Sequence, residues 1–388
     1  MSPKDFFFIF LLIGLVYRWI GIRSKNKHYT RRQRAFLYAL WVYHLGMGYL
    51  FYRYLLHHGG DSLRYWNLQS IPVGEADSWM AHWGVGTAFI QWVNFPFSHW
   101  LGLHFLTGTV GYATLSFFGF VPLLEWMGKR LQPLDASPVI IGGFLLVFLP
   151  NVHFWTAGVG KEAFLWLGLV LVMVGTQNFP AGWGYLLLGL LLSLMVRPIQ
   201  GLILTLSVAG ILPFLPSLRN YRRWVIPLGA ALIVGILGYR WILGSLEYGF
   251  HFGWIGELLD WQHRYLDSFG GNSRLPMADY SFPEKLAAVF FRPYPWEAEG
   301  FWPLAASLEN SLFFLLLVAG SLALLKRGMK RSIPYSYRIV FSYGILLSIL
   351  FALALNNLGV IMRMKSIYTV FMSCFFYECM TQGKSRLR

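Results

Sequence analysis

The apolar stretch Phe6-Phe-Phe-Ile-Phe-Leu-Leu-Ile-Gly-Leu-Val16, followed by a dense basic cluster, decides the fold class of this chain. In a signal peptide the positive charge precedes the apolar run, and a small-residue cleavage site follows it. Here the strong positive charge follows the run, and no such cleavage site appears. We therefore interpret the stretch as a first membrane helix with its N-terminus outside.

The composition extends this interpretation to the whole chain. Of its 388 residues, 56% are hydrophobic and only 13% are charged, whereas soluble domains carry about 25% charged residues. The repeated apolar runs predict an all-α, polytopic membrane protein. The net charge of +15 would suit a nucleic-acid partner. We expect none, because the basic residues fall in short clusters between apolar runs, the pattern that orients membrane helices.

About eleven membrane helices are predicted. Several are shorter than the ~20 residues that cross a bilayer, and those near 138–196 are expected to pair as bent or half-spanning hairpins around a cavity. Cys374 and Cys379 lie in the last run and are interpreted as packing residues. The predicted spans are 5–21, 35–56, 102–123, 138–153, 162–177, 183–196, 199–215, 224–243, 306–325, 339–356 and 367–380.

The basic clusters also predict the topology. They fall at every second loop, which gives an N-out, C-in arrangement. The chain is then one membrane domain: an N-terminal helix and basic inner loop (1–34), a helical core (35–243), a long outer loop (244–305) and C-terminal helices with a basic inner tail (306–388). Within the core, 67–100 is rich in tryptophan and predicts outer interfacial helices; an extra tilted span is the alternative. The basic clusters lie within 23–34, 129–130, 219–223, 326–338 and 384–388.

The outer side carries the candidate functional residues, and the first stretch is His57-His-Gly-Gly-Asp-Ser-Leu-Arg-Tyr-Trp66. Two glycines let the backbone turn sharply before Asp61. Asp61, Arg64 and Tyr65 fall within five residues, and a carboxylate beside a guanidinium suits a sugar and a phosphate. The alternative is an ordinary polar turn between two membrane helices.

The second stretch is Leu149–Glu162, which joins two short apolar runs. Glu162 suits the positive end of the next helix, which alone explains it. Lys161 gains nothing from the helix dipole and is a candidate phosphate ligand. Trp155 and His153 are candidate substrate-binding residues, with an interfacial or hydrogen-bonding role as the alternative for His153.

Further candidates follow at the next three outer segments. Arg197 precedes Pro198 and either snorkels to lipid head groups or faces a cavity. The long loop contains Phe290-Phe-Arg-Pro-Tyr-Pro-Trp-Glu297, a mixed set of aromatic and charged residues of the kind that commonly holds sugars. The remaining candidates are Arg292, Trp296 and Glu297 in this loop, Glu309 at the start of the following helix, and Arg363 and Lys365, which break the positive-inside pattern. For Arg363 and Lys365 the alternative is a surface turn at a bilayer interface.

Together these motifs resemble those of bacterial enzymes of surface-polysaccharide assembly: the Wzy-type and exopolysaccharide polymerases and the wider GT-C glycosyltransferase superfamily. The resemblance implies transfer of a sugar from a polyprenyl-phosphate or polyprenyl-diphosphate carrier to a glycan or lipid-linked acceptor, outside the bacterial inner membrane. Other polysaccharide-assembly proteins are possible partners. It also implies that an acid in the first outer loop is the general base, which maps to Asp61. The chain departs from the GT-C pattern in one respect, because an extra N-terminal helix precedes this acid.

We therefore expect a glycosyltransferase without cofactor or bound metal, in which Asp61 accepts the acceptor proton. Glu162 or Glu297 is the second choice for that role. The leaving phosphate would be stabilised by Lys161, Arg197, Arg292, Arg363 and Lys365. A flippase or other transporter is the main alternative, followed by a non-catalytic scaffold and a membrane protease.

Overall fold

The computed structural model describes residues 1–69, 78–131, 137–221, 260, 262–264, 266, 273–327 and 334–381. Over these residues the chain is helical, and the β-structure consists of one isolated antiparallel bridge between Arg274 and Asn357. The all-α prediction is therefore confirmed for the described part of the chain. The predicted span at 224–243 and much of the long loop at 244–305 lie outside the described residues.

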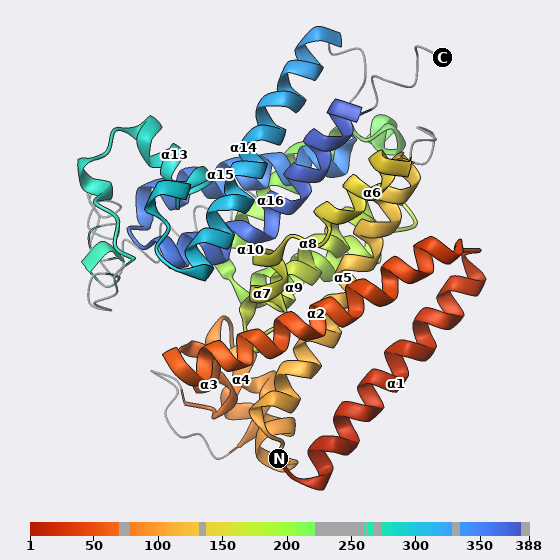
Figure 1. Ribbon diagram of the computed structural model, residues 1–388, viewed down its shortest axis with the longest axis vertical. Coiled ribbons are helices and arrows are strands. Elements are labelled where there is room, and N and C mark those ends of the chain that lie inside the picture. Colours follow the sequence, from red (N-terminus) through yellow and green to blue (C-terminus); the bar gives the residue numbers. More distant parts are fainter. Residues whose placement is uncertain are drawn as a thin grey trace.

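Figure 1 shows the helices and their labels. They are connected mostly by short turns, several of which contain proline or glycine. The helices are α1 (Pro3–Asn26), α2 (Arg31–His58), α3 (Asp61–Trp66), α4 (Thr87–Phe95), α5 (Phe105–Leu131), α6 (Ser137–Leu146), α7 (Pro150–Thr156), α8 (Lys161–Gln177), α9 (Trp183–Val196), α10 (Pro198–Ile211), α13 (Phe282–Phe291), α14 (Phe301–Arg327), α15 (Tyr335–Ala354) and α16 (Leu358–Thr381).

Five of these helices are long and apolar enough to cross a membrane. This supports an α-helical membrane protein, but five is fewer than the eleven spans predicted. Part of the difference is that the predicted 138–153 span is broken between α6 and α7, while α9 and α10 have 14 residues each. The five segments are Pro3–Asn26, Phe105–Lys129, Phe301–Lys326, Tyr335–Ala354 and Leu358–Thr381.

The short helices α8, α9 and α10 pack closely through small residues. A Cβ added to Gly168 would lie 2.5 Å from Ser193 Oγ, and one added to Gly201 would lie 2.4 Å from the Leu194 nitrogen. Small residues of this kind let helices approach closely where no water drives their association. Of the hairpins predicted near 138–196, one is found as α8 and α9, while the half-spanning placement around a cavity stays a prediction.

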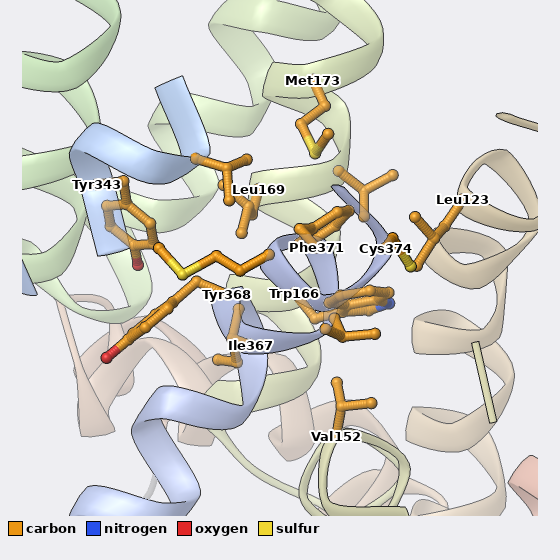
Figure 2. Close-up of a cluster of buried hydrophobic side chains, with 14 of the residues drawn as sticks. Leu123, Val152, Trp166, Leu169, Met173, Tyr343, Ile367, Tyr368, Phe371 and Cys374 are labelled. Carbon is orange, nitrogen blue, oxygen red and sulfur yellow. The ribbon is translucent and has the colours of Figure 1, made fainter. Parts of the chain in front are cut away.

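A large aromatic side chain fixes the middle of the bundle (Figure 2). Trp166 of α8 is fully buried, stacks on Phe371 of α16 at 5.1 Å, and donates its indole N–H to the Ser116 carbonyl of α5 at 3.1 Å. The buried indole therefore has the partner that its polar edge requires. Cys374 is buried in the same cluster, in agreement with the predicted packing role.

The helix ends fall into two groups at opposite ends of the bundle. At one end, Arg23 beside the α1–α2 turn donates to Glu125 of α5 at 2.6 Å, and Gln177 at the end of α8 donates to Ser336 of α15 at 3.3 Å. This end includes the basic cluster around the α1–α2 turn, and the N-out, C-in orientation stays a prediction. The opposite end, where α2 ends and α8 begins, is called the site end below; it includes α3 and α4 (Figure 1).

In the tryptophan-rich segment after α3, the described residues 78–100 form one α-helix, α4, flanked by the short helical turns Trp79–His82 and Pro96–Trp100. The rings of Trp79 and Trp92 stack at 5.0 Å, and Trp79 donates its N–H to the Trp92 carbonyl. Helical structure in this segment agrees with the prediction, whereas its place at a membrane interface stays a prediction.

Candidate functional site

The centre of the candidate site is the buried carboxylate of Glu162, in the first turn of α8. Its side chain is 2% exposed. Arg197 donates to Oε1, and Arg363 donates to Oε2 at 2.7 Å. Both carboxylate oxygens are thus engaged by guanidinium groups, which is what a carboxylate removed from water requires.

Glu162, Arg197 and Arg363 come together because each lies at or near the start of a helix. Glu162 follows the α7–α8 loop, Arg197 is the single non-helical residue between α9 and α10, and Arg363 lies near the start of α16. Pro198 begins α10 directly after Arg197, so the chain turns there without a loop. The turn predicted from Arg197-Pro198 is therefore found, and Arg197 points into the protein to pair with Glu162.

Asp61 lies at the edge of this group. Its side chain is 57% exposed, and its Oδ2 lies 3.7 Å from Arg363 Nη1. Gly59 and Gly60 precede it with φ values of 70° and 145°. Residues that carry a side chain rarely adopt positive φ values, so the sharp turn before Asp61 depends on the two glycines, as predicted.

Tyr65 and Trp155 provide aromatic faces for the cations. Lys161 Nζ lies 5.5 Å from the centre of the Tyr65 ring, and Arg363 Cζ lies 5.5 Å from that of Trp155. Burial, with the Asp61 carboxylate as the next cause, raises the pKa of Tyr65 to about 12. The Tyr65 hydroxyl therefore keeps its proton at neutral pH and remains a hydrogen-bond donor.

We call Asp61, Lys161, Glu162, Arg197 and Arg363 the charged cluster. With three cations and two carboxylates, it has a formal excess of one positive charge. The helices α8 and α10 both begin here, and helix N-termini also favour anions. The Nε atoms of Arg197 and Arg363 are buried without a hydrogen-bond partner among the described residues. This arrangement suits an anionic group of a ligand.

Two residues that border the cluster are missing from the predicted set. A Cβ added to Gly160 would lie 3.1 Å from Glu162 Oε2 and 3.9 Å from Ser62 Oγ. Any side chain at position 160 would therefore crowd the carboxylate that both arginines bind. The glycine-rich run before Lys161 was a sequence signal for Gly160; Ser62 had none beyond its place beside Asp61.

Lys365 was predicted to bind phosphate, but its environment indicates another role. It is 1% exposed, and its Nζ donates to the carbonyl oxygens of Phe290 and Arg292 at 2.9 and 3.1 Å. Asn310 donates to the same Arg292 carbonyl at 2.8 Å. Lys365 therefore anchors the chain at 290–292 to α16. Glu309 likewise accepts the backbone N–H of Asn151 at 2.9 Å, at the start of α7.

The group around Arg292 is held together by internal contacts. Arg292 binds both oxygens of Glu297, with its Nε and Nη2 each 2.9 Å from one of them, and donates to the Tyr280 hydroxyl. Trp296 is 81% exposed and stacks on Tyr294 at 4.9 Å. Glu297 is thus paired within this segment, while Glu162 is paired within the charged cluster.

His153 and Arg64 lie apart from the charged cluster's ion pairs. His153 is fully buried between His44, whose Nδ1 is 2.8 Å from its Nδ1, and the Val147 carbonyl, 2.7 Å from its Nε2. Both ring nitrogens have protein partners, so the substrate-binding prediction gives way to the hydrogen-bonding alternative. Arg64 is exposed on α3, one turn after Asp61.

Apart from His153 and Arg64, the predicted site residues form two groups at the site end. Asp61, Tyr65, Trp155, Lys161, Glu162, Arg197 and Arg363 meet in one place, although they come from five separate parts of the sequence. Arg292, Trp296 and Glu297 lie in the segment 290–297, which Lys365 anchors, and Glu309 binds the start of α7. Comparison of the chain with protein-family models, curated proteins and solved structures finds no match.

Proposed function

We propose that this protein is a membrane glycosyltransferase that takes a sugar from a polyprenyl-phosphate or polyprenyl-diphosphate carrier. The observation that carries the proposal is the charged cluster, in which an exposed Asp61 carboxylate lies 3.7 Å from a guanidinium held by a buried glutamate. A base for the acceptor and cations for a leaving phosphate are thereby adjacent. The motif resemblance to Wzy-type polymerases and GT-C enzymes points to the same activity.

In the proposed reaction, an acceptor hydroxyl attacks the anomeric carbon of the donor sugar. The bond between that carbon and the phosphate oxygen breaks, and the phosphate leaves with its lipid. Asp61 takes the proton of the attacking hydroxyl. Lys161 and Arg363 stabilise the charge that develops on the leaving oxygen, and Arg197 adds to the positive field.

The contacts favour Asp61 over the other two candidate bases. Glu162 is 2% exposed and has an arginine on each oxygen, so it lacks the access that proton transfer requires. Glu297 binds Arg292 through both oxygens. We assign Glu162 the role of holding Arg197 and Arg363 in place.

We further propose that the site end faces the outside of the bacterial inner membrane. The basic α1–α2 turn lies at the opposite end of the bundle, and loops rich in lysine and arginine stay on the cytoplasmic side. A donor carried in the outer leaflet would then reach the charged cluster from the lipid. This location suits assembly of an exopolysaccharide, an O-antigen or a capsule.

A lipid-linked oligosaccharide flippase is the second candidate, favoured by one observation. The chain breaks between α9 and α10 at a charged residue, Arg197, and transporters bind substrates at such broken helices. The exposure of Asp61 favours the enzyme, because a carboxylate at the mouth of a site is accessible to an acceptor.

The proposal is tested by reconstituting the purified protein in liposomes with the lipid-linked saccharides extracted from membranes that contain it. Released lipid phosphate, product length and the leaflet of the saccharide are measured. Transfer supports the enzyme, with long products indicating a polymerase and single additions a monoglycosyltransferase. Movement between leaflets without transfer would favour the flippase. If the protein neither transfers the saccharide nor moves it between leaflets, both functions are contradicted.

A further inference from the structure

An aromatic surface adjoins the charged cluster at the site end. It begins at Trp302, in the first turn of α14, whose ring centre lies 5.2 Å from that of Phe154. Phe154 contacts Trp155 at 5.1 Å, and Trp155 lies under the guanidinium of Arg363 at 5.5 Å. A continuous series of ring contacts therefore leads from Trp302 to the arginine beside Asp61.

The end of α2 forms the other side of this surface. The ring of Tyr54 lies 6.3 Å from that of Trp302 and stacks on His58 at 4.3 Å with an interplanar angle of 18°. His58 is exposed, and its Nδ1 lies 3.0 Å from the Tyr54 carbonyl. Since a carbonyl only accepts, the Nδ1 carries the proton, and the Nε2 of a neutral ring can accept a hydrogen bond from a ligand.

We propose that this surface, formed by Tyr54, His58, Trp155 and Trp302, binds the acceptor saccharide and directs its hydroxyl to Asp61. The inference rests on the proposed glycosyl transfer and names the acceptor subsite within it. Sugar rings have apolar faces that pack on aromatic rings and hydroxyls at their edges that need polar partners. The surface offers both, with aromatic faces from three helices and an imidazole and a carboxylate at its border.

The chemistry of the surface argues for a saccharide over a lipid. An acyl chain would cover His58 and Asp61 without giving them hydrogen-bond partners, which is costly for polar groups. Trp302 is 40% exposed, whereas its neighbour Phe301 is 74% exposed and meets the Trp302 ring edge-on at 5.2 Å. Phe301 is therefore the better candidate for lipid contact and gives a matched control.

The experiment measures binding of soluble saccharides to the protein in lipid nanodiscs. The probe is the oligosaccharide fraction released by mild acid from the lipid-linked saccharides of membranes that contain the chain. The wild type should bind it, and Trp302→Ala should raise the Kd about fivefold, which corresponds to the ~1 kcal/mol that a stacked ring typically contributes. Phe301→Ala should leave the Kd within twofold. The exposed His58→Ala provides a second variant and should also weaken binding.

Absence of wild-type binding would overturn the subsite, as would equal binding by the Trp302→Ala and wild-type proteins. Equal weakening by Phe301→Ala and Trp302→Ala would also overturn it, because it would indicate a general effect at the membrane interface. The liposome transfer assay judges the proposed function separately. Transfer with an unchanged acceptor KM in Trp302→Ala would reject the subsite and retain the enzyme.

Discussion

Glu162 accepts a 2.7 Å hydrogen bond from Arg363, a residue 201 positions later in the chain. Arg197 binds the other oxygen of the same carboxylate. One buried side chain thus ties together the starts of α8, α10 and α16, and the geometry of the charged cluster depends on it. A change at Glu162 is therefore expected to affect both the stability of the protein and the geometry of the charged cluster.

Replacing Glu162 with glutamine should destabilise the protein strongly. The change leaves two arginines facing a neutral amide, and loss of one partner of a buried ion pair typically costs about 3–5 kcal/mol. Thermal unfolding in detergent should show a clearly lowered midpoint. Glu299→Gln, at an exposed position, is the matched control and should change the midpoint little.

The double variant Glu162→Gln with Arg363→Gln tests whether the loss of stability in Glu162→Gln comes from an unpaired arginine. If the penalty comes from unpaired charge, removing one arginine should recover part of the stability, so that the two changes are not additive. Additive losses would show that the cost does not come from an unpaired arginine, since glutamine keeps the size of glutamate and removes only its charge. A midpoint equal to wild type in the single variant would contradict the ion-pair interpretation.

Replacing Asp61 with asparagine should abolish most transfer while leaving the fold intact. Loss of a general base typically lowers the rate about 10²–10⁴-fold, and a side chain that is 57% exposed contributes little to packing. Initial rates of lipid-phosphate release in liposomes measure the effect. Asp279→Asn, an exposed aspartate in the turn Met277–Asp279, should transfer at the wild-type rate.

Two outcomes would contradict the assignment of Asp61 as the general base. Full activity of Asp61→Asn would exclude Asp61 from proton transfer. An equal loss in Asp61→Asn and Asp279→Asn would indicate a general structural disturbance and no specific role of Asp61. A loss confined to Asp61→Asn, with an unchanged thermal midpoint, is the predicted result.

Much of the helical pattern could be predicted from the sequence, because apolar runs and basic clusters report on burial and orientation directly. The predicted spans at 183–196 and 339–356 lie close to α9 (Trp183–Val196) and α15 (Tyr335–Ala354). The number of membrane-crossing helices was less predictable, because length and apolarity do not say whether a short helix crosses a bilayer or packs within the bundle.

The residue types of the charged cluster were also predictable, because a charge beside a membrane helix is costly and suggests a function. Their pairing was not. Nothing in the sequence connects Glu162 with residues 35 and 201 positions away, because such pairs depend on how the helices pack. For the same reason Lys365, which looked like a phosphate ligand, binds backbone carbonyls instead.

Replacing Lys365 with methionine should loosen the segment at residues 290–297. The substitution keeps an unbranched chain of similar size but removes the donor to the carbonyls of Phe290 and Arg292, leaving buried acceptors without it. Hydrogen–deuterium exchange of this segment should rise. Lys285→Met, on neighbouring α13 and partly exposed, is the control, and equal exchange in both variants would contradict the anchoring role.

Replacing Gly158 with alanine should disturb both stability and the charged cluster. A Cβ at this position would lie 2.0 Å from the Phe51 ring of α2, so the α7–α8 loop must shift, at a typical cost of about 1–3 kcal/mol. Lys161 and Glu162 follow within four residues, so transfer should fall together with the thermal midpoint.

Gly46→Ala gives the control for this last substitution, because the added Cβ meets no atom within 4 Å. Gly46 lies on the same helix as Phe51, and alanine there should stabilise the helix by up to about 1 kcal/mol. Pairing Gly158→Ala with Phe51→Leu removes the ring and should restore part of the midpoint and of the activity. If the second change restores neither, crowding against Phe51 is not the cause, and the tight contact between the loop and α2 does not position the charged cluster.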